Sequence, residues 1–133
     1  MKSITYIFFL LLTWILLLGN TSQITAEWLA PHYTDTLINP FSDEIKAIAD
    51  GKKIYENVCW TCHGLEGKGD GPAAIKLNPK PADHTSHKVQ NQTDGAIFWK
   101  LSKGNGEMPP FDKTLSKTQR WKLVSYIRSL GKP

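Results

Sequence analysis

Near the C-terminal end of the chain, apolar residues recur at intervals of three and four, which is the spacing of one face of an α-helix. These residues are Leu123, Tyr126, Ile127 and Leu130. Ser116 and Gln119 precede them with the spacing of a capping box, in which two side chains pair with free backbone N–H groups. Gly131 and Pro133 follow, and both residue types end helices. The pattern predicts a helix that begins after Ser116 and ends before Gly131.

Two further stretches carry weaker versions of the same helical pattern. The first helix is expected over about residues 44–57, with Ser42 or Asp43 as its cap. Its apolar side would hold Ile45, Ile48, Tyr55 and Val58. The second helix is expected to begin at a Thr93 or Asp94 cap and to end near Ser102. Its apolar side would hold Ile97, Phe98 and Leu101.

Glycine and proline interrupt the segments between these helices. Residues 64–92 and 103–113 are expected to be irregular, apart from a short helical turn at about 72–77. Residues 27–41 contain prolines and few helical signals, and we interpret them as an extended arm lying over the domain. The chain shows neither the alternation typical of strands nor an internal repeat. The predicted fold class is all-α, with three main helices, long Gly/Pro-rich loops and one core.

The start of the chain has the layout of a secretory signal peptide. Lys2 precedes an apolar run over residues 4–18, and the polar stretch that follows ends on the small residue Ala26. The run is shorter than the roughly 20 residues that a membrane-spanning helix needs. The competing interpretation is an uncleaved segment that anchors the protein in the membrane through residues 4–18. The predicted organisation is a signal segment over 1–26, the arm over 27–41 and one domain over 42–133.

The charge of the chain limits the partners that it would bind. The 133 residues carry a formal net charge of +4 at pH 7, and the lysines that dominate it are spread along the chain. Dispersed lysines argue against a nucleic-acid-binding arm. They suit weak docking onto acidic partners, which would weaken as the salt concentration rises.

The only two cysteines form the most informative motif, Cys59-Trp60-Thr61-Cys62-His63. Two thiols three positions apart can each add to one vinyl group on the same edge of a haem, and His63 can then bind the iron. A zinc site fits poorly, because a closed site needs four ligands and the chain has no second cysteine pair. A redox dithiol is expected in a βαβ context, which the pattern lacks. The motif therefore predicts one covalently attached haem c.

Haem iron has a second axial position, for which Met108 is the best candidate ligand. It lies in the segment Gly104-Asn105-Gly106-Glu107-Met108-Pro109-Pro110-Phe111, where glycines allow close approach and prolines stiffen the chain. Ligation by histidine and methionine is typical of haem electron carriers and raises the reduction potential. The rival ligands are His84 and His87, which we interpret as surface residues among polar neighbours.

With these motifs in place, the chain resembles the bacterial class I monohaem cytochromes c over about residues 50–131. The segment Asp50-Gly51-Lys52-Lys53-Ile54-Tyr55 is similar to the N-terminal helix of that family. Leu123 and Tyr126 match the C-terminal helix that packs against it. The resemblance implies the cytochrome c fold, preceded here by the signal or anchor segment. It also implies that Gly51 and Tyr126 interlock where the two helices cross.

The same resemblance implies further roles around the haem. The loop Gly64-Leu65-Glu66-Gly67-Lys68-Gly69-Asp70-Gly71-Pro72 is similar to a family loop in which a proline carbonyl accepts the ring N–H of the axial histidine. Here that carbonyl would belong to Pro72. Met108-Pro109-Pro110-Phe111 matches the loop of the distal ligand. The helix that contains Trp99 would wall the haem, with Trp99 either contacting a propionate or packing in the core.

The expected function is that of an exported electron carrier in a respiratory-type chain, not an enzyme. Its donor and acceptor would be redox proteins, membrane-bound respiratory complexes in particular, and it would lie in the periplasm or be anchored to the outer face of the inner membrane. Three lysines would contact partners around the haem edge, namely Lys68, Lys76 and Lys103. The alternatives are a haem subunit of a larger oxidoreductase and, in another class, a haem peroxidase or gas sensor with an open sixth position.

Overall fold

A computed structural model describes residues 27–132 of the chain. Within these residues the fold is helical and contains no strand, which confirms the all-α prediction. The longer helices are α2 (Ile45–Val58), α5 (Asp94–Lys103) and α6 (Lys117–Leu130). Between them lie two single-turn helices, α3 (Trp60–His63) and α4 (His87–Gln90), and the 3-10 turns η1 (His32–Thr36) and η2 (Ala74–Lys76). None of the helices in this part of the chain is long and apolar enough to cross a membrane. The predicted signal segment over residues 1–26 and the helix-ending Pro133 lie outside the described residues.

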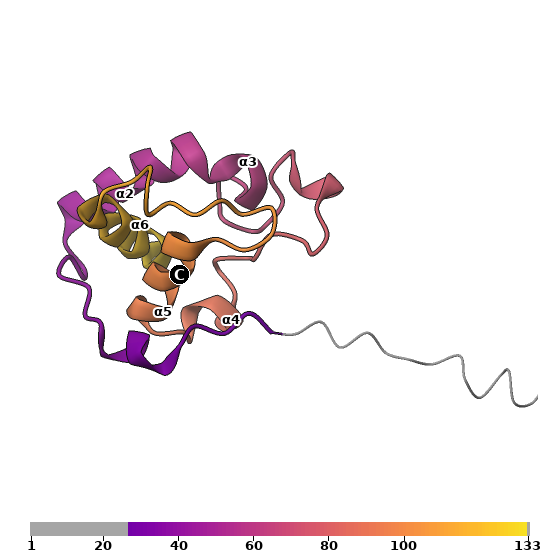
Figure 1. Ribbon diagram of the computed structural model, residues 1–133. Coiled ribbons are helices and arrows are strands. Elements are labelled where there is room, and N and C mark those ends of the chain that lie inside the picture. The colour runs from indigo at the N-terminus through magenta and orange to yellow at the C-terminus, as the bar shows by residue number, and fades with distance from the viewer. Residues whose placement is uncertain (1–26, 133) are drawn as a thin grey trace, which may run out of the picture.

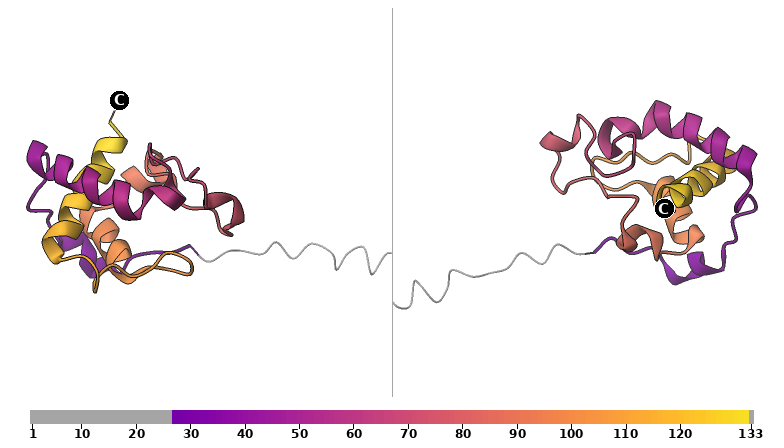
Figure 2. Two further views of the ribbon diagram at one scale, coloured as in Figure 1. Left: turned by 90° about the horizontal axis from the view of Figure 1, so that it is seen from above. Right: turned by 180° about the vertical axis from the view of Figure 1, so that it is seen from behind.

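Helices α2 and α6 cross in close contact, with α2 along one edge of the fold (Figure 1), and they lie side by side in the other two views as well (Figure 2). A Cβ atom on Gly51 would lie 2.9 Å from the Cβ atom of Tyr126 and would collide with the backbone carbonyl of Lys122. Only a residue without a side chain therefore allows the two backbones to approach so closely. Beside this contact, the ring of Tyr126 meets the edge of the Tyr55 ring, with centroids 5.1 Å apart. The interlock expected between Gly51 and Tyr126 is confirmed.

The buried side of α2 agrees only in part with its sequence pattern, since Tyr55 is buried and Ile48 is half-buried against the core as expected. Its buried residues follow one another at intervals of four and are Ala47, Gly51 and Tyr55. Ile45 is 85% exposed and Val58 is 44% exposed. At Gly51 the close crossing leaves no space for a side chain, whereas one turn further on the ring of Tyr55 packs against Tyr126. The predicted cap is also wrong, since the residue before the helix is Glu44, which makes no side-chain cap bond, and not Ser42 or Asp43.

The caps predicted for α5 and α6 are confirmed. The hydroxyl of Thr93 accepts a bond from a backbone N–H in the first turn of α5 at 3.1 Å. At the start of α6, the N–H of Gln119 donates to the hydroxyl of Ser116 at 3.2 Å. The side chain of Gln119 accepts the N–H of Ser116 at 2.8 Å in return. These bonds satisfy donors that a helix start leaves free, so the two helices begin where the sequence indicates.

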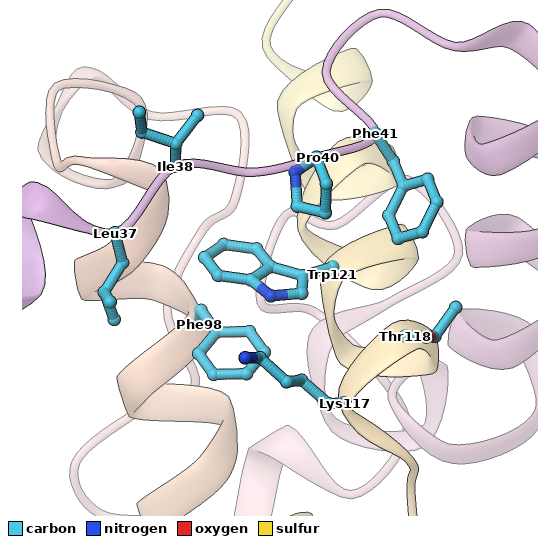
Figure 3. Close-up of a pocket in the computed structure, with 8 residues that line it drawn as sticks. All are labelled: Leu37, Ile38, Pro40, Phe41, Phe98, Lys117, Thr118 and Trp121. Carbon is cyan, nitrogen blue, oxygen red and sulfur yellow. The ribbon is translucent and has the colours of Figure 1, made fainter.

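The arm over residues 27–41 packs through η1 against α5, on the side of the fold away from α2, and then runs up to the start of α2 (Figure 1). Thr34 in η1 is fully buried, and its carbonyl lies so close to Gly95 of α5 that no side chain would fit there. Figure 3 shows the arm passing over Trp121 of α6 and Phe98 of α5, whose rings stack with centroids 4.0 Å apart. These two rings line a groove beside the arm, and no residue of the cysteine motif takes part in it.

Asn39 joins the arm to α6 through buried hydrogen bonds. It is 4% exposed, its amide donates to the hydroxyl of Ser125 at 3.0 Å, and its carbonyl oxygen accepts the N–H of Phe41 at 3.0 Å. We expect Asn39→Ala to leave the N–H of Phe41 unpaired, to remove one of the bonds of Ser125 and to lower the free energy of unfolding by about 1–3 kcal/mol. Urea denaturation followed by tryptophan fluorescence measures this loss. The control is Thr36→Ala, because the exposed Thr36 bonds only within the arm. Equal losses in the two variants would contradict the prediction.

Candidate haem site

The cysteine motif forms the single turn α3 immediately after α2. The N–H of Cys59 donates to the carbonyl of Tyr55 at 2.9 Å, and the N–H of His63 donates to the carbonyl of Cys59 at 2.9 Å. Helical hydrogen bonding thus continues through the motif. Residues three and four apart lie on the same side of a helix, so this turn brings Cys59, Cys62 and His63 together on one side. Cys59 is buried, and the other two are half-buried.

The glycine-rich loop after the motif wraps around the C-terminal end of α3. Three of its backbone N–H groups, from Gly69, Gly71 and Ala73, donate to the carbonyls of His63, Cys62 and Thr61 at 2.8, 3.1 and 2.9 Å respectively. A helix end leaves such carbonyls without partners inside the helix. A Cβ atom on Gly71 would collide with the carbonyl of Thr61, so the loop needs glycine at this position. The loop therefore holds the motif in its helical turn through several backbone bonds.

The ring of His63 is oriented by a backbone carbonyl. Its Nδ1 lies 3.0 Å from the carbonyl oxygen of Ala82, and since a carbonyl only accepts, Nδ1 carries the proton. The lone pair on Nε2 is then available to a metal. Burial lowers the pKa of His63, which favours the neutral form that binds metals. The structure corrects the prediction for this bond, because the carbonyl comes from Ala82 and not from Pro72.

The physical reason for this correction lies in the path of the chain. The N–H of His84 donates to the carbonyl of Gly67 at 2.6 Å and ties the segment around Ala82 to the glycine-rich loop. That segment therefore passes beside the His63 ring. Pro72 is exposed and lines a surface pocket together with Gly64 and Gly71.

His84 is buried, which corrects the prediction that it is a surface residue. It is 8% exposed, and its ring stacks on the ring of His63 with centroids 4.2 Å apart and planes 18° apart. Burial lowers the pKa of His84 to about 3, so the ring is uncharged at neutral pH. Two imidazoles that lie face to face cannot approach one iron from opposite sides, so this arrangement excludes His84 as the ligand opposite His63. His87 is exposed, as predicted.

Met108 lies in a tightly closed loop. Asn105 and Met108 pair through two backbone hydrogen bonds, of 2.9 and 3.0 Å. Further along, the N–H of Phe111 donates to the carbonyl of Leu101 at 3.0 Å and fastens the loop to the end of α5. The side chain of Met108 is half-buried and packs against the hydrophobic core to which Cys59 belongs. The loop thus holds a thioether at the core, and its role as axial ligand stays a prediction.

Trp99 lies against the arm. Its ring is 6.3 Å from the ring of Trp28, at an angle of 50°, and the ammonium of Lys100 lies 5.2 Å from the centroid of the Trp28 ring. Trp99 is half-buried and packs against the arm, and its contact with a propionate stays a prediction.

The three lysines proposed for partner contacts are all exposed. Lys68 is paired with Glu66 at 2.6 Å, and Lys103 lies 3.8 Å from Asp112. Pairing with a carboxylate reduces the positive field around Lys68 and Lys103. Of the three lysines, Lys76 therefore attracts acidic partners most strongly.

The chemistry of the cysteine pair fits a covalent haem better than zinc or a redox dithiol. Among residues 27–132, no three His, Cys, Asp or Glu side chains are grouped so that they could hold a metal ion. Both cysteines are free thiols. Burial raises the pKa of Cys59 to about 12, whereas a redox-active thiol needs a lowered pKa. Two free thiols followed by a histidine with an available Nε2 are the groups that haem c requires.

A family model described as "Cytochrome C oxidase, cbb3-type, subunit III" matches residues 46–127, a range that includes the cysteine motif and Met108. Among solved structures, a chain of a reducing HAO-like protein complex from Kuenenia stuttgartiensis is 36% identical, with a TM-score of 0.65, over 74% of this chain and 49% of that chain. The chain described here thus spans about half the length of that one. The c-type cytochrome KustC0563 is 28% identical, with a TM-score of 0.55, over 62% of this chain and 99% of its own. No curated protein gives a significant match.

Proposed function

Because the chain belongs to the cytochrome c family, through the model described as subunit III of cbb3-type cytochrome c oxidase, we propose that it is an exported carrier of single electrons. Members of this family bind haem c covalently, and electron transfer is their function. The haem, when bound, supplies an iron that alternates between the ferrous and ferric states. The observation that carries the proposal is that one family match covers both the Cys59–His63 motif and Met108.

The residues of this chain have distinct tasks in that proposal. Cys59 and Cys62 would hold the cofactor through thioether bonds, and His63 and Met108 would be the axial ligands. The Ala82 carbonyl keeps the proton on Nδ1 of His63 at 3.0 Å and so leaves Nε2 free for the iron. Two protein ligands leave no open position for oxygen or peroxide. This arrangement suits transfer of an electron and not chemistry on a bound substrate.

The proposal places the protein outside the cytoplasm. The signal-like pattern of residues 1–26 supports export, either with cleavage or with an anchor in the outer face of the inner membrane. A covalently attached cofactor also suits an exported protein, which could not replace a lost haem. The donor and acceptor would be redox proteins of a respiratory-type chain, met through short-lived contacts with dispersed lysines.

A carrier and a haem enzyme differ in the reactivity of the sixth position. We expect the purified protein to titrate reversibly as a single one-electron couple, to bind cyanide slowly in the ferric state and to show no turnover with peroxide. The control is the same titration in the presence of cyanide, which would block an open site at once. Rapid cyanide binding together with peroxide turnover would contradict the carrier and support the peroxidase.

The second candidate function is that of a haem subunit in a larger oxidoreductase. The observation that favours it is the 36% identity to a chain of a reducing HAO-like protein complex. The chemistry at the haem would be the same, and only the partner would be fixed. Purification under mild conditions from the native host separates the two candidates. A dedicated subunit would elute together with a large complex, whereas a mobile carrier would elute alone.

A further inference from the structure

His84 is held firmly beside His63. Its N–H donates to the carbonyl of Gly67 at 2.6 Å, and its own carbonyl accepts the side-chain amide of Gln90 at 2.6 Å. Its ring lies between the stacked ring of His63 and the ring of Tyr55, which meets it edge to face with centroids 5.8 Å apart. Two hydrogen bonds of its backbone and two contacts with aromatic rings therefore set the position of the His84 ring.

The ring of His84 acts through its face. Its Nδ1 is buried and has no hydrogen-bond partner. A buried polar atom without a partner is unusual in folded proteins and calls for an explanation. This nitrogen contributes no bond, and the ring makes an edge contact with Tyr55 and a parallel contact with His63, with centroids 4.2 Å and planes 18° apart. The contact covers one face of the imidazole that would bind iron.

One hydrogen bond alone does not fix the rotation of a histidine ring. The bond from Nδ1 of His63 to Ala82 sets the direction of one ring edge, but the ring can still tilt about that bond. A flat neighbour packed against its face removes this remaining freedom. The bond and the stacking contact together define the plane of the His63 ring.

We propose that His84 is a positioning residue for the axial histidine: its ring face fixes the plane of the His63 imidazole, while the Ala82 carbonyl fixes the direction of Nε2. The proposal rests on the proposed function, since it takes His63 as the iron ligand. It also connects the helix crossing to the site, because Tyr126 contacts Tyr55, Tyr55 contacts His84, and His84 contacts His63. The crossing of α2 and α6 thereby supports the orientation of the ligand.

The test compares holoprotein variants that keep or lose a flat ring. His84→Phe keeps a planar face without the polar nitrogens, and His84→Leu keeps an apolar side chain without the face. The exposed His87 gives the matched control, His87→Phe. The readout is the spread of the haem methyl resonances in the ferric protein by proton NMR, which depends on the plane of the axial imidazole. Intact mass of each variant measures haem attachment separately.

We expect His84→Phe and His87→Phe to retain the wild-type pattern of methyl shifts and His84→Leu to change the order or spread of these shifts. If His84→Leu does not fold, His84→Phe still tests the proposal, because the proposal requires this variant to keep the wild-type pattern of haem methyl shifts. A changed pattern in His84→Phe, or an unchanged pattern in His84→Leu, would overturn the proposal. Absence of attached haem in the wild-type protein would instead count against the proposed function.

Discussion

Replacing Met108 with leucine is expected to leave the haem attached and to remove its sixth ligand. Leucine conserves the volume of methionine, so the half-buried side chain can still pack against the core. It offers no sulfur atom to the iron. We expect high-spin ferric spectra, rapid cyanide binding and a fall in midpoint potential on the order of 0.1 V, within the roughly 0.8 V range that axial ligation spans. Absorption spectra and a redox titration measure these changes.

The matched control for Met108→Leu is His87→Leu, which removes a rival ligand from an exposed position. This variant should keep the spectrum and potential of the wild type. If His87→Leu changes the spectrum and Met108→Leu does not, the assignment of the sixth ligand is wrong and the loop around Asn105 and Met108 has a structural role only.

Replacing Gly51 with valine is expected to unfold a large fraction of the protein. The Cβ atom would collide with the Lys122 carbonyl and would lie 2.9 Å from the Cβ of Tyr126. Neither position can yield without moving the backbone of α6, so the loss should be about 3 kcal/mol or more, the upper end of what overpacking costs. Chemical denaturation measures this loss. Because α2 leads directly into the cysteine motif, we also expect less attached haem.

The control for Gly51→Val is Ala49→Val, an exposed position on the same helix. Valine lowers helix propensity relative to alanine at the exposed Ala49, which costs less than about 1 kcal/mol, and raises it relative to glycine at Gly51. The difference between the two variants therefore isolates the close crossing of α2 and α6. Similar denaturation midpoints for both variants would show that the crossing is looser than the structure indicates.

Elements that follow from local sequence were predicted well. The helices capped by Thr93 and Ser116 begin at those residues, because each cap is a bond between a side chain and the backbone within one turn. The contact of Gly51 with Tyr126 was also predicted, in this case from the family resemblance. In α2 the apolar pattern was right for Tyr55 and wrong for Ile45 and Val58, which are exposed. The sequence pattern shows which residues of α2 are apolar. Which of them can be buried depends on how closely α2 and α6 approach, and the pattern does not contain that distance.

The parts of the site that were not predicted depend on contacts between distant segments. The carbonyl that orients His63 comes from Ala82, and a carbonyl leaves no mark on the sequence because every residue has one. The neighbours of His84 in the sequence are polar and suggest a surface position, but the bond from its backbone N–H to the Gly67 carbonyl holds it against the glycine-rich loop. The glycines between residues 64 and 72 were the available signal, since a run of close backbone approaches indicates that another segment packs there.

The central claim is that this chain carries one covalent haem whose iron is ligated by His63 and Met108. The most direct measurement combines the intact mass of the exported protein with its ferric absorption spectrum into the near infrared. The account predicts a mass of the polypeptide plus one haem, low-spin iron and the near-infrared band of a methionine thioether bound to ferric iron. A mass without haem, or haem in a high-spin state without that band, would contradict it.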